Sequence, residues 1–146
     1  MNDVATNILE VSDLCVDYAS TTSFGVTGAP SVRAVKGISL TLQRGETLSL
    51  VGESGCGKST TAMAILQLTP PSGGRVVFDG RDITSFSHRQ MRPLRREMQV
   101  IYQDPFGSLN PRMTIADLIA EPMAIQGVGR SGHERRAKAA ELLDTV

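Results

Sequence analysis

The chain has 146 residues, and its 15 Lys and Arg residues balance 15 Asp and Glu residues, so the formal net charge is zero. A hydrophobic fraction of 40% and a charged fraction of 21% are ordinary for a soluble globular domain and exclude a disordered tail, a collagen-like chain and a strongly basic nucleic-acid binder. No apolar run approaches the roughly 20 residues of a membrane-spanning helix, and residues 1–10 lack the apolar core of a signal peptide. Two cysteines make no disulfide framework. We therefore expect a soluble, cytosolic protein.

The first half of the chain alternates apolar and polar residues in the manner of β-strands. Strands are expected over residues 8–18, 32–42 and 47–51. A loop rich in Ser, Thr and Gly separates the first two, which we expect to pair antiparallel, and the third runs straight into Gly52. Good helix formers then predict a helix from Lys58 to Leu68, which Thr69-Pro70-Pro71 stops.

Turn and capping residues divide the second half into short elements. Strands are expected over residues 75–78 and 98–102, with a hairpin turn at residues 79–80. Helix N-caps are expected at Ser87, Thr114 and Ser131. The first opens a basic segment that Pro93 breaks, and the second opens a helix through Ala124. Glu134 fits a capping box with Ser131 and a favourable i,i+4 pair with Lys138.

A glycine-rich loop at residues 52–59 matches the phosphate-binding pattern of Gly, four residues, then Gly-Lys-Ser/Thr. Glycines let the backbone wrap closely around a phosphate, and the loop amides and the following helix N-terminus attract an anion. Lys58 can reach the β- and γ-phosphates, Ser59 can place a hydroxyl on Mg²⁺, and Thr60 can bond the α-phosphate. The residues expected to bind nucleotide here are Gly52, Glu53, Ser54, Gly55, Cys56, Gly57, Lys58, Ser59 and Thr60. A chance glycine-rich turn is the alternative, but the position between a predicted strand and a predicted helix favours nucleotide binding.

Further segments surround this loop in a recognisable order. They are Ala34-Val35-Lys36-Gly37-Ile38-Ser39-Leu40, Arg44-Gly45-Glu46, Gly73-Gly74-Arg75-Val76 and Phe78-Asp79-Gly80. The order resembles the amino-terminal half of an ABC transporter ATP-binding subunit, over nearly the whole chain from Ile8. Residues 99–114 are similar to the Q-loop region of the dipeptide and oligopeptide importers, a subfamily that also includes nickel and glutathione importers. The insertion at residues 19–33 resembles the F-type rather than the D-type subunit.

The resemblance assigns roles to three positions outside the phosphate loop. Tyr18 matches the aromatic residue that stacks on adenine, although it could also be a strand-end tyrosine packed on a neighbour. Gln103 matches the Q-loop glutamine, whose amide reaches both Mg²⁺ and the attacking water, although it could also be an ordinary turn residue. Val35 is a further candidate for adenine contact. Residues 104–114 would meet the permease.

The resemblance also implies a fold, cofactors and partners. The fold is α/β, a P-loop NTPase of the ABC ATPase type, with an antiparallel β subdomain and a RecA-like core. Residues 1–103 would hold the β subdomain and P-loop core, and residues 104–146 the Q-loop and the start of the helical subdomain. ATP and Mg²⁺ are the expected cofactors, with Ser59 and Gln103 at the metal.

The implied partners are a second ABC ATPase subunit in a head-to-tail dimer, two transmembrane permease subunits and, indirectly, a periplasmic or extracellular solute-binding protein. No nucleic-acid partner is expected. The protein would act peripherally at the cytoplasmic face of a bacterial membrane. There it would couple ATP binding and hydrolysis to the uptake of peptides or similar small solutes.

Several parts of the family's machinery are absent from this sequence. It has no Leu-Ser-Gly-Gly-Gln signature, no Walker B Asp followed by a catalytic Glu, and no switch histidine. We therefore expect a truncated piece, ending within the helical subdomain, with no catalytic residue beyond Lys58 and Gln103. Such a piece would bind nucleotide without turning it over alone. The alternatives are a non-catalytic regulatory fragment that binds nucleotide and another P-loop enzyme such as a kinase, against which the Tyr18 and Gln103 segments argue.

Other conspicuous features favour ordinary structural roles. Asp104-Pro105-Phe106-Gly107 fits a GTPase pattern, but the sequence has no Asn-Lys-x-Asp guanine reader. Residues 76–79 resemble a Walker B strand, but Gly80 follows the Asp, so a hairpin turn is the better interpretation. On a net-neutral chain, the cluster Arg89, Arg92, Arg95 and Arg96 is expected to be a solvated helix face. His88 and His133 are expected to be exposed.

Overall fold

The computed structural model of the protein describes residues 7–18, 31–104 and 106–146. The chain divides between Met98 and Gln99 into two compact units. The division expected from the sequence, after residue 103, separates the P-loop core from the Q-loop and helical subdomain by their expected functions, and it stays a prediction.

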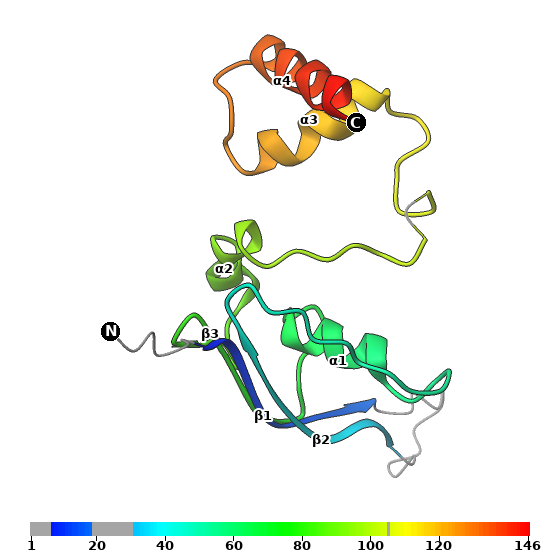
Figure 1. The fold of residues 1–146 in the computed structure, drawn as a ribbon, viewed down its shortest axis with the longest axis vertical. Coiled ribbons are helices and arrows are strands. Elements are labelled where there is room, and N and C mark those ends of the chain that lie inside the picture. The colour runs from blue at the N-terminus through cyan, green and yellow to red at the C-terminus, as the bar shows by residue number, and fades with distance from the viewer. Residues whose placement is uncertain (1–6, 19–30, 105) are drawn as a thin grey trace, which may run out of the picture. The chain divides into compact units, whose positions relative to one another are not determined.

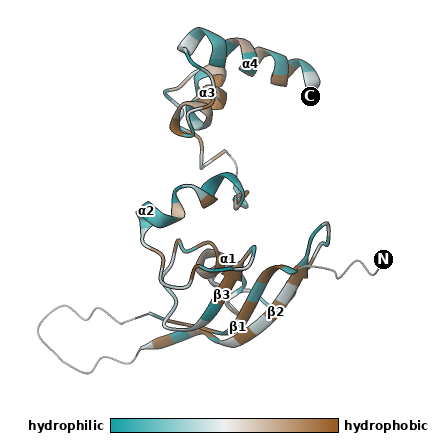
Figure 2. Cartoon of the chain, turned by 90° about the vertical axis from the view of Figure 1, so that its left-hand side faces the viewer, coloured by the Kyte–Doolittle hydropathy of each residue, from teal (hydrophilic) through white to brown (hydrophobic). Residues whose placement is uncertain are grey.

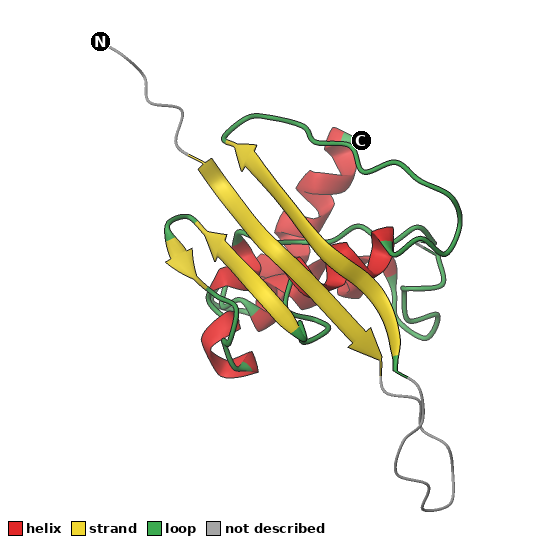
Figure 3. Cartoon of the chain, turned by 90° about the horizontal axis from the view of Figure 1, so that it is seen from below, coloured by secondary structure: helices red, strands yellow, loops and turns green. Residues whose placement is uncertain are grey.

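The first unit is built on a four-stranded antiparallel sheet with the order β2-β1-β3-β4 (Figure 3). Its strands are β1 (Asn7–Tyr18), β2 (Val32–Gln43), β3 (Gly73–Phe78) and β4 (Arg81–Asp82). Hydrophobic and hydrophilic residues alternate along β1 and β2, so one face of the sheet is apolar (Figure 2). The expected antiparallel pair and the hairpin at residues 79–80 are both confirmed.

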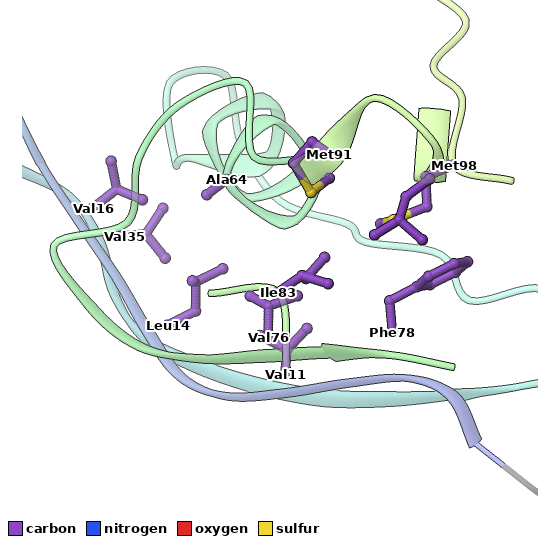
Figure 4. Packing of buried hydrophobic residues seen from close by; sticks show 11 residues of the cluster. Val11, Leu14, Val16, Val35, Ala64, Val76, Phe78, Ile83, Met91 and Met98 are labelled. Atoms are coloured by element: carbon purple, nitrogen blue, oxygen red, sulfur yellow. The ribbon is translucent and has the colours of Figure 1, made fainter. Parts of the chain in front are cut away.

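The core of this unit lies between that apolar face and helix α1 (Lys58–Ile65), which crosses the sheet (Figure 1). Leu14, Val16 and Val35 from the strands meet Ala64 from α1, and all four are buried (Figure 4). Helix α2 (His88–Met91) and the 3-10 helix η1 (Leu94–Arg96) close the other end of the core. Ser87 begins α2 with the capping box that holds its first turn, which confirms the expected N-cap.

The expected strands at residues 47–51 and 98–102 are wrong: both segments are irregular chain. Met98 is buried in the core, but other apolar side chains of these segments are exposed, with Val51 88% and Ile101 95% exposed. A strand forms only where a neighbour supplies backbone hydrogen bonds, and in the described residues the four-stranded sheet takes in neither segment. Helix α1 also ends earlier than expected, at Ile65, because Gln67 adopts a left-handed conformation.

The second unit consists of helices α3 (Ile115–Ile125) and α4 (Gly132–Thr145) after an irregular segment. Thr114 and Ser131 accept hydrogen bonds from the first turns of these helices, which confirms both N-caps. Arg136 on α4 binds Asp117 on α3 at 2.9 Å and, with the Thr114 hydroxyl, holds the pKa of that carboxyl below its usual range. No helix in the described ranges is both long and apolar enough to span a bilayer.

Two side-chain contacts expected on α4 are wrong. Lys138 pairs with Glu141 at 2.7 Å instead of with Glu134. Glu134 does not complete a capping box, because its carboxylate accepts a hydrogen bond from the Arg130 amide at 2.7 Å. Exposed helix pairs of this kind differ by only a few tenths of a kcal/mol, so sequence spacing alone does not select among them.

Candidate nucleotide-binding loop

The phosphate-loop candidate connects the irregular segment after β2 to the first turn of α1. Gly55 and Gly57 have φ values of +80° and +98°, which side-chain-bearing residues rarely adopt. A Cβ on Gly57 would lie 2.4 Å from the Ala34 carbonyl oxygen, closer than real Cβ atoms come to another atom. Gly57 is therefore required twice, by its backbone conformation and by its close packing on β2.

A β-bulge in β2 lies where the loop meets the sheet. Val16 pairs with Val35 and Asp17 pairs with Arg33, so Ala34 is the extra residue between these two pairs. The Ala34 carbonyl is the group that lies against Gly57. Bulges occur often beside functional sites because they re-aim backbone and side chains, and this one sets where the loop sits on the sheet.

Lys58 closes the loop from its position at the start of α1. Its ammonium Nζ donates hydrogen bonds to the carbonyl oxygens of Gly52 at 2.8 Å and Glu53 at 2.6 Å, and it lies 3.5 Å from Cys56 Sγ. The charged group thus lies at the centre of the loop, and its three N–H donors could exchange these partners for phosphate oxygens.

The donors and shape of the loop fit a polyphosphate. The first turn of α1 carries no acidic side chain, so the positive end of the helix is not neutralised locally. Ser59 is exposed and Thr60 is half-buried on that turn, where both hydroxyls can reach a ligand. In the described part of the chain, no group of three or more His, Cys, Asp or Glu residues could hold a metal ion. A cation here would need phosphate oxygens as well as Ser59, as Mg²⁺ commonly does.

Thr61 is a site residue that the motif did not reveal. Its hydroxyl and its amide both donate to the Gly57 carbonyl, at 2.9 and 2.8 Å, and its side chain is buried. It fixes the junction of loop and helix. The run of three hydroxyl residues after Lys58 was the available signal, but the phosphate-binding pattern ends at the first of them, Ser59.

Tyr18 lies near this loop at the end of β1. It pairs with Val32, which is two residues from the bulged Ala34, or about 7 Å along a strand. Tyr18 is also two residues beyond buried Val16, so strand alternation places it on the face that α1 covers. Its side chain is 46% exposed, which leaves ring surface for a ligand.

The expected adenine contact of Val35 is wrong. Its side chain is 2% exposed and belongs to the core beside Ala64 (Figure 4). Val35 pairs with Val16 and both residues are buried, so Val35 presents almost no surface to a base.

Gln103 belongs to the second unit and is exposed in irregular chain. The adjacent Asp104 accepts a hydrogen bond from the Gly107 amide at 2.9 Å, so this Asp holds a local turn. The role of Gln103 at Mg²⁺ stays a prediction.

Arg95 in the basic cluster at residues 89–96 is not the solvated charge that was expected. Arg95 is half-buried and donates to the carbonyl oxygens of Leu66 at 2.5 Å and Gln67 at 3.4 Å. These carbonyls follow the last turn of α1, so Arg95 caps the helix that begins with Lys58. Arg89, Arg92, Arg96, His88 and His133 are exposed, as expected. Asp79 forms an ion pair with Arg44 at the hairpin, as a turn residue would.

Comparisons with known proteins show which family this chain resembles. The family described as "ABC transporter" matches residues 35–146. The chain is 50% identical over 115 residues to the "Oligopeptide transport ATP-binding protein OppD" of Mycobacterium tuberculosis, covering 79% of this chain and 18% of that protein. It is 46% identical over 122 residues to the "Oligopeptide transport ATP-binding protein OppF" of Bacillus subtilis, covering 83% and 40%. The chain thus spans less than half the length of these relatives. Because both D and F proteins match, the F-type expectation stays a prediction.

Solved structures share the fold. The ATP-binding cassette MJ0796, a dimer bound to ADP and Pi, superposes with a TM-score of 0.75 at 27% identity, over 93% of this chain and 56% of that one. The cbiO1 protein of Clostridium perfringens, part of the transporter complex cbiONQ, superposes with a TM-score of 0.67 at 25% identity, over 94% and 49%. The expected fold, an α/β P-loop NTPase of the ABC ATPase type with an antiparallel β subdomain, is confirmed.

Proposed function

Because the chain belongs to the ABC transporter family, we propose that residues 52–60 and Tyr18 bind ATP in an ATPase subunit of a peptide importer. The observation that carries the proposal is the packing of Gly57 on the bulged Ala34. Tyr18 pairs with Val32, two residues from Ala34 along β2, so the phosphate loop lies close to Tyr18. One nucleotide could then place its phosphates in the loop and its base on the tyrosine ring.

The residues of the loop would divide the work of holding the triphosphate. Lys58 would exchange its carbonyl partners for β- and γ-phosphate oxygens, and the loop amides would donate to the same groups. Thr60 would bond the α-phosphate. Ser59, together with Gln103, would hold a Mg²⁺ ion that neutralises charge on the phosphates. Tyr18 would stack on the base.

The transport role rests on the relatives. OppD and OppF are both described as oligopeptide transport ATP-binding proteins. We infer that this chain contributes ATP binding and hydrolysis to uptake of peptides or similar small solutes, at the cytoplasmic face of a bacterial membrane. A second ATPase subunit, two permease subunits and a solute-binding protein would complete the assembly, and residues 104–114 would contact the permease.

An ATP titration of the purified chain tests the phosphate site. Lys58→Ala removes a charged hydrogen-bond donor worth about 1.5–3 kcal/mol, so the dissociation constant of MgATP should rise about 10- to 150-fold. Lys36→Ala is the matched control, because Lys36 is an exposed lysine on β2 outside the loop. Unchanged ATP affinity in Lys58→Ala, or an equal loss in both variants, would contradict the proposed site.

A further inference from the structure

Three side chains from separate segments meet immediately beside Tyr18. The carboxylate of Asp17 accepts a hydrogen bond from Arg33 Nε at 2.9 Å on one oxygen and from Ser72 Oγ at 2.9 Å on the other. Asp17 lies on β1, Arg33 on β2 and Ser72 in the connection between α1 and β3. A single carboxylate therefore ties together three stretches of chain that surround the end of β1.

Backbone contacts reinforce this junction. Asp17 and Arg33 are direct partners in the strand register, and the next pair is Tyr18 with Val32. The Ser72 amide also donates to the Cys15 carbonyl at 2.9 Å, so Ser72 is attached to β1 through both its backbone and its side chain. The Arg33 guanidinium and the Ser72 hydroxyl hold the pKa of Asp17 below its usual range, so both contacts favour the charged carboxylate.

The bulge explains why the end of β1 depends on such a contact. Ala34 interrupts the register between the buried Val16–Val35 pair and the two terminal pairs. A bulge disrupts the ladder locally, so the terminal pairs are not a simple continuation of the regular sheet. Asp17 is the residue of β1 that follows the interruption, and its side chain supplies the cross-strand link there.

Resting on the ATP site proposed above, we propose that Asp17, Arg33 and Ser72 are positioning residues that hold the end of β1 so that Tyr18 presents its ring to the nucleotide base. A stacking ring contributes more affinity when its backbone is already fixed, because otherwise part of the gain is lost in ordering it. The three residues do not touch the nucleotide. They act on the base through Tyr18 and leave the phosphate loop unchanged.

The test compares ATP with inorganic tripolyphosphate, which has the phosphates but no base. Dissociation constants of both ligands, with Mg²⁺, are measured for the whole chain and for its Tyr18→Ala, Asp17→Asn and Ser72→Ala variants. Base stacking on an aromatic side chain corresponds to about 5- to 150-fold in affinity, so Tyr18→Ala should weaken ATP binding by that factor. Asp17→Asn should lose a large part of the same factor, and Ser72→Ala a smaller part. None of the three should change tripolyphosphate binding.

Asp82 provides a matched control on the same sheet. Its carboxylate accepts a hydrogen bond from Arg75 Nε at 2.7 Å and another from the Thr84 hydroxyl at 2.6 Å, so it repeats the chemistry of Asp17. Asp82 on β4 pairs with Val77 on β3, and Val77 pairs with Glu10 on β1. Glu10 is about 25 Å along β1 from Tyr18. Asp82→Asn should therefore leave the affinities of both ligands unchanged.

The double variant Asp17→Asn/Tyr18→Ala decides whether Asp17 acts through the ring. If it does, the double variant binds ATP as Tyr18→Ala does, with no further loss. Equal weakening of ATP and tripolyphosphate by Asp17→Asn, or no change by both Asp17→Asn and Ser72→Ala, would overturn the positioning role. If Asp17→Asn does not fold, Ser72→Ala and Arg33→Lys carry the same comparison.

The proposed ATP site fails separately. It fails if Lys58→Ala leaves the affinities of both ligands unchanged. An unchanged ratio of ATP to tripolyphosphate affinity in Tyr18→Ala, with loss of both ligands in Lys58→Ala, overturns the stacking and positioning roles and leaves the phosphate site intact.

Discussion

Both the backbone conformation and the packing at Gly57 require glycine. Gly57→Ala introduces a Cβ at φ +98° and 2.4 Å from the Ala34 carbonyl oxygen. The left-handed conformation costs a residue with a side chain about 1–2 kcal/mol, and forcing an atom into close-packed surroundings costs about 1–3 kcal/mol more. We expect the free energy of unfolding to fall by about 2–5 kcal/mol.

Gly55→Ala separates these two contributions. Gly55 has φ +80°, but a Cβ there meets nothing within 4 Å, so it carries the backbone cost alone, about 1–2 kcal/mol. Urea unfolding of both variants measures the difference. A larger loss in Gly57→Ala than in Gly55→Ala is the expected result. Equal losses would refute the claim that the loop is packed against the bulge of β2.

Three other predictions concern the core, the pH dependence and the loop cysteine. Leu14→Ala removes a fully buried side chain and should lower the free energy of unfolding by about 2–5 kcal/mol in urea, whereas Val51→Ala at an exposed position should change it by less than about 0.5 kcal/mol. Arg75 and Thr84 lower the pKa of Asp82 from 3.8 to about 2, so the stability that this carboxylate contributes is complete above pH 4 and is lost as pH falls toward 2. The difference in unfolding free energy between the native chain and Asp82→Asn should therefore shrink over that range. A constant difference would contradict this expectation. Cys56 is exposed within the loop while Cys15 is half-buried, so MgATP should slow alkylation of Cys56, as followed by mass spectrometry, and equal labelling rates with and without MgATP would count against the site.

The sequence predicted those parts of the fold that depend on local signals. Alternation located β1 and β2, the Asp79-Gly80 turn located the hairpin, and Ser87 and Thr114 marked helix starts. Residues 47–51 have the same apolar character as a strand. Whether they become one depends on a partner strand, which a local pattern does not contain. The phosphate loop was predicted because its residues are contiguous.

The rest of the site was hidden by sequence distance. Asp17 contacts Arg33 and Ser72, which lie 16 and 55 residues away, and no local pattern links them. The bulge at Ala34 and the C-terminal cap that Arg95 gives to α1 are likewise properties of the packed chain. Val35 shows the converse error, because an apolar strand residue near a binding site can equally be core.

Amide chemical shifts measured by NMR during a MgATP titration test the central claim most directly, because they report each backbone N–H separately. We expect the largest shifts at residues 52–60, together with a shift of the Tyr18 ring, while residues 75–82 at the far side of the sheet change little. Saturable ATP binding with its largest shifts in α3 and α4, or no shifts in the loop at any ATP concentration, would contradict the assignment of this loop as the nucleotide site.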